Sequence, residues 1–175
     1  MEAQRHEITG DIPVLGQGAL SPEALRAANI NPDTGLATDY LNHFNEVMML
    51  MEMLPDMPDC AEDVLAWEPA DYAQHFTSSG FKDKDLAVLA WRAAPRPVRA
   101  HLVTVVLQIE AEVERAQDML RGDADAAACR TVAQLATDCI KPLIIAASGA
   151  IHGKVEGEDE YQDESVQAGV DALFG

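Results

Sequence analysis

Two short segments of the sequence carry nearly the same set of side chains that could do chemistry. They read Asp39-Tyr40-Leu41-Asn42-His43-Phe44 and Asp71-Tyr72-Ala73-Gln74-His75-Phe76. In a helix, each segment places an acid, a carboxamide three residues later and a histidine four residues later on one face. Groups of these types can pair with one another, bind a metal ion or position a water molecule. The repeated hexamer is therefore the first candidate site.

The simplest interpretation of the hexamer is structural. An acid in the first turn of a helix meets the positive end of the helix dipole, and a tyrosine with a phenylalanine four residues later is a common core pair. On this interpretation each aspartate pairs with the histidine four residues after it, at the surface. Neither His43 nor His75 is then expected to accept a phosphoryl group.

A second interpretation is a metal site. Asp39, His43 and Glu46 share one helical face, and Asp71 with His75 shares another, so two crossing helices could enclose one cation. The sequence has no Glu-x-x-His pair and no histidine-rich cluster. We therefore predict no metal site.

A third interpretation concerns the carboxamides. Asp71 with Gln74, and Asp39 with Asn42, each place a carboxylate and a carboxamide one helical turn apart. A carboxamide both donates and accepts hydrogen bonds, so it can hold a water molecule in line for attack on a phosphoryl group. The acid can at the same time anchor a lysine of the partner. These four residues are the candidate catalytic residues for hydrolysing an aspartyl phosphate carried by another protein.

Charge and cysteine content limit the class of protein. The 175 residues include 30 acidic and 12 basic side chains, a formal net charge of −18. Such a charge repels phosphate backbones and anionic lipids, so we expect neither nucleic acid nor a membrane surface as partner. Three cysteines without paired or ligand-type spacing, and no apolar leader or membrane-length segment, predict a cytoplasmic protein.

The second half of the chain predicts a long antiparallel helical hairpin. Apolar residues recur every three or four positions at Val98, Leu102, Val105, Ile109, Val113, Ala116 and Leu120, and again at Cys129, Val132, Ala136, Leu143, Ala147 and Ile151. We expect Gly122 to end the first arm in the left-handed conformation and Asp123 to cap the second. Pro142 should kink or interrupt the return arm.

Shorter helices precede the hairpin. Helix starts and stops predict segments from Ser21 to Asn29, from Thr38 or Asp39 to Leu54, and three more before Pro95. The fold class is therefore all-α, with four or five shorter helices packed against the hairpin and residues 1–20 as an extended arm. Met48, Met49, Met51, Met53 and Met57 form a cluster that either fills the core, the interpretation we favour, or makes an adaptable docking surface.

The chain after the hairpin changes character twice. Residues 154–164 are strongly acidic and predict a mobile linker between the helical domain, residues 1–153, and the end of the chain. Residues 165–175 are amphipathic, with Val166, Val170, Leu173 and Phe174 on one helical face. A helix of this length is unstable by itself. We therefore expect residues 165–175, which we call the docking peptide, to fold either on its own hairpin or in a partner's groove.

The docking peptide carries a family resemblance. Its sequence Gln167-x-x-Val170-Asp171-x-Leu173-Phe174 resembles the peptides that end the CheZ chemotaxis phosphatases and begin the flagellar switch protein FliM. Both families bind the phosphorylated response regulator CheY, and in CheZ the peptide is tethered to a long helical hairpin. The resemblance implies a CheY-like partner bound by Val170, Asp171, Leu173 and Phe174. It also implies that Mg²⁺ belongs to the partner's receiver domain, with no cofactor on this chain.

The resemblance leaves the catalytic group open. The hairpin lacks the Asp-x-x-x-Gln of CheZ, because Asp138 is followed four residues later by Pro142. A catalytic carboxamide would then be Gln74 or Asn42. Three hypotheses stand: a receiver-binding protein, with or without dephosphorylation; a non-catalytic helical adaptor for another protein; and a metal-binding helical protein.

Overall fold

The computed structural model describes residues 13–153. Within that range the chain is all-α, which confirms the predicted fold class. The acidic linker and the docking peptide, with its predicted partner-binding residues Val166, Val170, Asp171, Leu173 and Phe174, lie outside the described residues.

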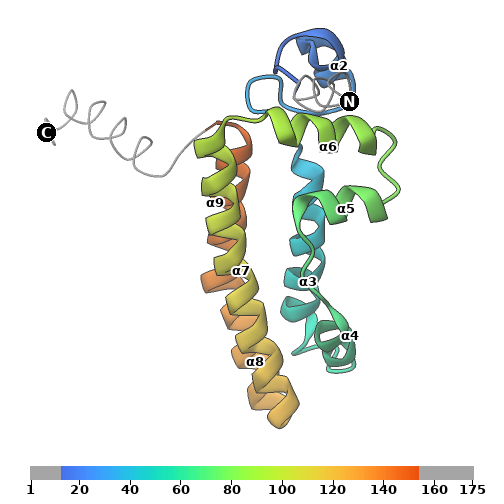
Figure 1. The fold of residues 1–175 in the computed structure, drawn as a ribbon. Coiled ribbons are helices and arrows are strands. Elements are labelled where there is room, and N and C mark those ends of the chain that lie inside the picture. The colour runs from blue at the N-terminus through green and yellow to red at the C-terminus, as the bar shows by residue number, and fades with distance from the viewer. Residues whose placement is uncertain (1–12, 154–175) are drawn as a thin grey trace, which may run out of the picture.

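A long helical hairpin forms one side of the molecule (Figure 1). Its first arm is α7 (Arg96–Gly122), and its second arm comprises α8 (Ala126–Leu135), the π-helical segment η3 (Ala136–Ile140) and α9 (Lys141–Ile151). The predicted apolar positions face the seam, where Ile109, Val113 and Ala116 of α7 and Val132 and Ala147 of the return arm are fully buried. The hairpin is confirmed, and so is its seam except at Leu143, which is only partly buried, whereas the next residue, Ile144, is buried.

The turn of the hairpin differs from the prediction. Gly122 belongs to α7 and does not take a positive φ, and Asp123 follows it in an extended conformation. The residue that caps α8 is Asp125, whose side chain accepts a hydrogen bond of 2.8 Å from the amide of Ala128. Our prediction that Asp123 caps the second arm is wrong. A capping side chain accepts from the backbone amide three residues further along the chain, and at the start of α8 that amide is the one of Ala128, which lies within reach of Asp125.

Pro142 interrupts the return arm as predicted. The five residues before α9 form a π-helical turn, and the amide of Lys141 donates to the carbonyl of Ala136, five residues back. Pro142, which has no amide hydrogen to donate, is the second residue of α9 and directly follows this π-helical turn. The wider turn accommodates the proline within an otherwise continuous arm.

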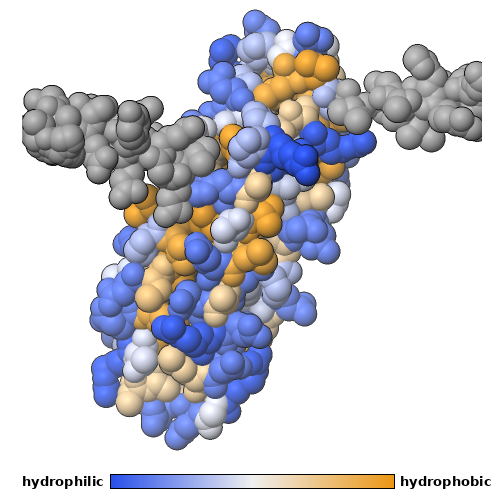
Figure 2. All heavy atoms as spheres, turned by 60° about the vertical axis from the view of Figure 1, so that its left-hand side comes forward, coloured by the Kyte–Doolittle hydropathy of each residue, from blue (hydrophilic) through white to orange (hydrophobic). Residues whose placement is uncertain are grey.

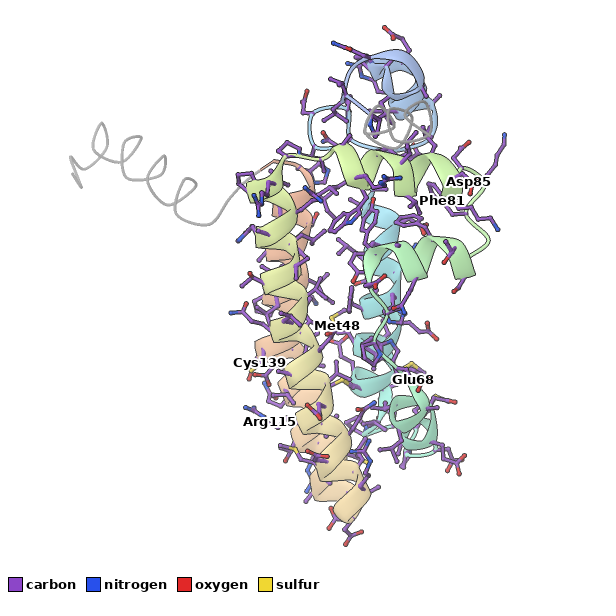
Figure 3. All side chains as sticks on the ribbon, in the orientation of Figure 1. Met48, Glu68, Phe81, Asp85, Arg115 and Cys139 are labelled. Carbon is purple, nitrogen blue, oxygen red and sulfur yellow. The ribbon has the colours of Figure 1, made fainter. Side chains whose placement is uncertain are left out.

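Five shorter α-helices precede the hairpin in the described chain. They are α2 (Pro22–Ala27), α3 (Asn42–Met53), α4 (Cys60–Ala66), α5 (Tyr72–Ser78) and α6 (Lys84–Ala93). In Figure 1, α3 runs roughly parallel to the hairpin and α6 crosses above α5 and α3. Figure 3 shows Met48 of α3 between that helix and the hairpin, where it is nearly fully buried.

Two segments differ from what the sequence led us to expect. Val14 to Leu20 is not extended: it forms turns and the 3-10 helix η1 (Gly18–Leu20), and Leu20 is completely buried. The end of α3 is not buried all round, because Met49, Met53 and Met57 are exposed. That part of the methionine prediction is wrong, since α4 covers only one side of α3.

None of the helices in residues 13–153 combines the length and the apolar character needed to cross a bilayer.

Candidate functional site

The two hexamers pack against each other and exchange hydrogen bonds. The hydroxyl of Tyr40 donates to the carbonyl of Ala70 at 2.9 Å, and the amide of Ala37 donates to the hydroxyl of Tyr72 at 2.8 Å. The two tyrosine rings meet edge to face, with centroids 5.2 Å apart. Burial raises the pKa of both phenols well above the ordinary value. Each hexamer is thus tied to the segment just before the other.

The backbones of the hexamers differ. The first begins in the 3-10 helix η2 (Thr38–Leu41), which leads into α3. The second begins with Asp71 as the N-cap of α5, in a complete capping box. The amide of Gln74 donates to the Asp71 carboxylate at 2.8 Å, and the amide of Asp71 donates to Oε1 of Gln74 at 2.9 Å. The second acid–carboxamide pair therefore stabilises a helix start.

In the first acid–carboxamide pair, the aspartate contacts a histidine of the other hexamer. Oδ2 of Asp39 lies 2.9 Å from Nε2 of His75, and Nδ2 of Asn42 donates to Oδ1 of Asp39 at 3.1 Å. We expected Asp71 to pair with His75 and Asp39 with His43. That expectation is wrong, because capping turns the Asp71 carboxylate toward the backbone of α5 and the approach of α5 brings His75 to Asp39.

His43 has a different environment from His75. Its ring stacks on Trp67 with centroids 4.6 Å apart, and its backbone carbonyl accepts from the Trp67 indole at 3.0 Å. Its Nε2 is buried and has no hydrogen-bond partner among residues 13–153. Burial, followed by the neighbouring His75, lowers the pKa of His43. His43 therefore packs mainly as an aromatic ring.

Asp39, Asn42 and His75 line a polar cleft. Two adjoining hollows of about 480 and 620 Å³ share Asn29, Asp39, Asn42 and Phe81 in their walls. The cleft lies where the chain after α2 meets the α5–α6 connection and the end of α9. Arg26 and His152 line one hollow and Lys82 lines the other. A phosphoryl group entering the cleft would meet both acceptors and cations.

Asp71 and Gln74 lie at a separate, apolar pocket. This pocket has a volume of about 310 Å³ and is lined mainly by Tyr40, Pro69, Tyr72, Trp91, Leu102, Val103, Val106 and Leu107. Glu110 of α7 also lines it, and burial, followed by the Asp71 charge, raises the pKa of Glu110. The four candidate catalytic residues are therefore divided between two surfaces of the molecule.

The two carboxamides are not equally available. Oε1 of Gln74 accepts the Asp71 amide, whereas Oδ1 of Asn42 accepts no hydrogen bond from the described residues. The bond from Nδ2 of Asn42 to Asp39 fixes the carboxamide, which leaves its oxygen free to accept from water. Of the two pairs, Asp39 with Asn42 is the better placed to bind a water molecule beside a ligand.

The described residues contain no group of three or more His, Cys, Asp and Glu side chains arranged to hold a metal ion. Asp39 and His75 contribute only two potential ligands, and Asn42 already uses the other Asp39 oxygen. Within residues 13–153, the cleft therefore brings together acidic, carboxamide and basic side chains.

Sequence reasoning missed several residues of these sites. Arg26, Lys82 and Glu110 lie outside the two hexamers in the sequence, and no motif marks them. Trp67 and Trp91 gave only the general signal that large aromatic residues often line pockets. Their places in these sites depend on which helices pack against each other.

No protein-family model, curated protein or solved structure matches this chain.

Proposed function

We propose that this chain binds a phosphorylated receiver domain through residues 165–175 and uses the polar cleft to promote hydrolysis of its aspartyl phosphate. The observation that carries the cleft's role is the set of Asp39, Asn42 and His75 on one wall, with Arg26 and Lys82 nearby. The partner class follows from the resemblance of the terminal peptide to those of CheZ and FliM.

In the proposed reaction Asn42 positions the water. Its Nδ2 is held by Asp39, so Oδ1 accepts a hydrogen bond from a water molecule and orients it toward phosphorus. The water oxygen forms a bond to phosphorus, and the bond from phosphorus to the receiver's aspartyl oxygen breaks. The products are inorganic phosphate and the free carboxylate, and the proton lost by water leaves with the phosphate.

The charged residues of the cleft have supporting roles. Arg26 and Lys82 form no ion pair with the described residues, so they are free to contact phosphate oxygens. His75 holds the Asp39 carboxylate, which in turn holds the Asn42 carboxamide. Mg²⁺ belongs to the receiver in this proposal, and this chain supplies orientation and positive charge.

A second candidate is a non-catalytic adaptor, which the apolar pocket favours. Val103 and Leu107 lie one helical turn apart on α7 at this pocket and are 44% and 60% exposed. Figure 2 shows hydrophobic surface, in orange, along the hairpin side of the molecule, between hydrophilic residues. Exposed apolar side chains beside a pocket are typical of a surface that binds another protein.

The test uses the full chain and purified CheY-like receiver domains phosphorylated with acetyl phosphate. Affinity and phosphate lifetime are measured for the protein, for a chain ending before Ser165, for Asn42→Ala and for Gln74→Ala. Loss of the terminal peptide should weaken binding about thirtyfold or more, as loss of an apolar anchor does. Asn42→Ala should abolish the acceleration of phosphate loss with affinity unchanged, and Gln74→Ala is the matched control.

The outcomes separate the hypotheses. Tail-dependent binding without any change in phosphate lifetime would leave the adaptor as the function. Binding that survives truncation, or no binding to any receiver, would overturn the proposal. An equal loss of acceleration in both carboxamide variants would assign the activity to neither residue.

A further inference from the structure

Three methionines, two on α3 and one in the turn after it, have exposed side chains and so do not serve to fill the core. Met49, Met53 and Met57 are 55%, 38% and 51% exposed. Met49 and Met53 are one helical turn apart, so they share the face of α3 opposite to that of the buried Met51. We call the hollow beside them the methionine groove; it is lined by Glu46, Met49, Leu50, Met53, Asp63, Ala66 and Trp67.

The methionine groove is a formed feature between two helices. It lies between α3 and α4 and has a volume of about 480 Å³. Trp67, just after α4, is held at its indole by the carbonyl of His43 and at its own carbonyl by Nε2 of Gln117. Gln117 also donates to Val64 at 2.9 Å, which ties the end of α4 to α7. One wall of the groove is therefore rigid, while the methionines supply flexible side chains.

The charged residues that line the methionine groove, Glu46 and Asp63, are both acidic, and so are all the charged residues of the chain segment that contains α3 and α4. Residues 27–81 contain no lysine or arginine. They contain ten carboxylates: Asp33, Asp39, Glu46, Glu52, Asp56, Asp59, Glu62, Asp63, Glu68 and Asp71. Glu46 and Asp63 line the groove, and neither forms an ion pair with a described residue. A ligand with positive charge around an apolar surface would complement both features.

We propose that the methionine groove binds an amphipathic helix whose polar face is basic. Methionine side chains are flexible and polarisable, so they can adjust to the apolar face of an incoming helix. The surrounding carboxylates would meet lysine or arginine residues at its edges. The chain's own docking peptide is a poor occupant, because it contains Asp171 and follows an acidic linker. The groove shares no residue with the polar cleft, so the inference is independent of receiver binding.

The binding test uses a defined probe, an 18-residue peptide of leucine and lysine with the leucines at helical spacing. Two control peptides accompany it: one with the same composition but no apolar face, and one with glutamate in place of lysine. The full chain is labelled with ¹³C at its methionine methyl groups and followed by NMR. The resonances of Met49 and Met53 should shift with the amphipathic basic peptide, while those of buried Met51 and of Met119 on α7 should not.

Variants of exposed residues localise the site without disturbing the core. Met49→Gln with Met53→Gln should weaken binding of the amphipathic basic peptide about tenfold or more, as removal of apolar anchors does. Its control is Ile145→Gln, which removes an apolar side chain that is 66% exposed on α9. Glu46→Gln with Asp63→Asn should reduce the dependence of affinity on salt, with exposed Glu114→Gln on α7 as control.

Three results would overturn the inference. Equal affinity for the peptide without an apolar face would reduce the interaction to net charge. Unchanged affinity in the methionine double variant would place the peptide elsewhere. Shifts at Met119 as large as those at Met49 and Met53 would mean that binding is not confined to the groove.

Discussion

The segments Asp39–Phe44 and Asp71–Phe76 have nearly the same sequence, yet only their apolar residues have the same role. Phe44 and Phe76 are both completely buried, and Tyr40 and Tyr72 each form a hydrogen bond with the backbone just before the other segment. The polar residues differ: one aspartate caps a helix and the other binds a histidine 36 residues away. Periodicity therefore assigns the apolar positions, whereas the roles of polar residues depend on the elements that approach them.

The largest expected effect tests the shared core role. Phe44→Ala and Phe76→Ala each remove a fully buried ring and should lower the free energy of unfolding by about 3–5 kcal/mol. Urea unfolding followed by circular dichroism measures both. Val103→Ala, at an exposed position, is the control and should change stability by less than about 0.5 kcal/mol. A cost near zero at one phenylalanine would break the equivalence of the two segments.

The two tyrosines should differ in how much the loss of their hydroxyl lowers the free energy of unfolding. Tyr72→Phe leaves the buried amide of Ala37 without a partner and should cost about 1–3 kcal/mol. Tyr40→Phe leaves the carbonyl of Ala70, which is only partly buried and can bind water, so the cost should be about 1 kcal/mol or less. The same unfolding measurement compares them. Equal losses of stability in the two variants would mean that the burial of the backbone group left without a partner does not set the cost of removing the hydroxyl.

The aspartates should differ in how they tolerate substitution. Asp71→Ala removes the N-cap of α5 and should cost about 1 kcal/mol, whereas Asp71→Asn should be nearly neutral because asparagine caps equally well. Asp39→Ala removes the partly exposed contact with His75 and should cost less than about 1 kcal/mol. Thermal melts of the three variants measure this. If Asp71→Asn cost as much as Asp71→Ala, capping would not be the source of the stability.

The smallest effect concerns His43. Because burial lowers the pKa of His43 below its ordinary 6.5, the unfolded chain binds a proton more readily than the folded one. Its contribution to stability is therefore fully present above pH 6.5 and is lost as the pH falls toward the lowered value. His43→Phe, which keeps a ring beside Trp67, should reduce the loss of stability between pH 7.5 and 5.5 in urea unfolding. A pH dependence identical in both proteins would contradict this.

The sequence by itself determined the features that arise within a few residues along the chain. The apolar spacing predicted both arms of the hairpin, and the ring of Pro142 predicted an interruption before α9. Ser21 was correctly predicted to begin α2, with Pro22 in the first turn. These depend on backbone geometry and local hydrogen bonds, which the order of residue types specifies.

Only the tertiary structure decided which polar groups meet and which apolar groups remain at the surface. His75 binds Asp39 rather than Asp71 because α5 packs beside η2, and the sequence contains no local signal for that approach. The methionines at the end of α3 divide into buried and exposed because α4 covers only part of the helix. The candidate catalytic residues separate into a polar cleft and an apolar pocket for the same reason: side-chain partners over such separations are set by how the helices pack.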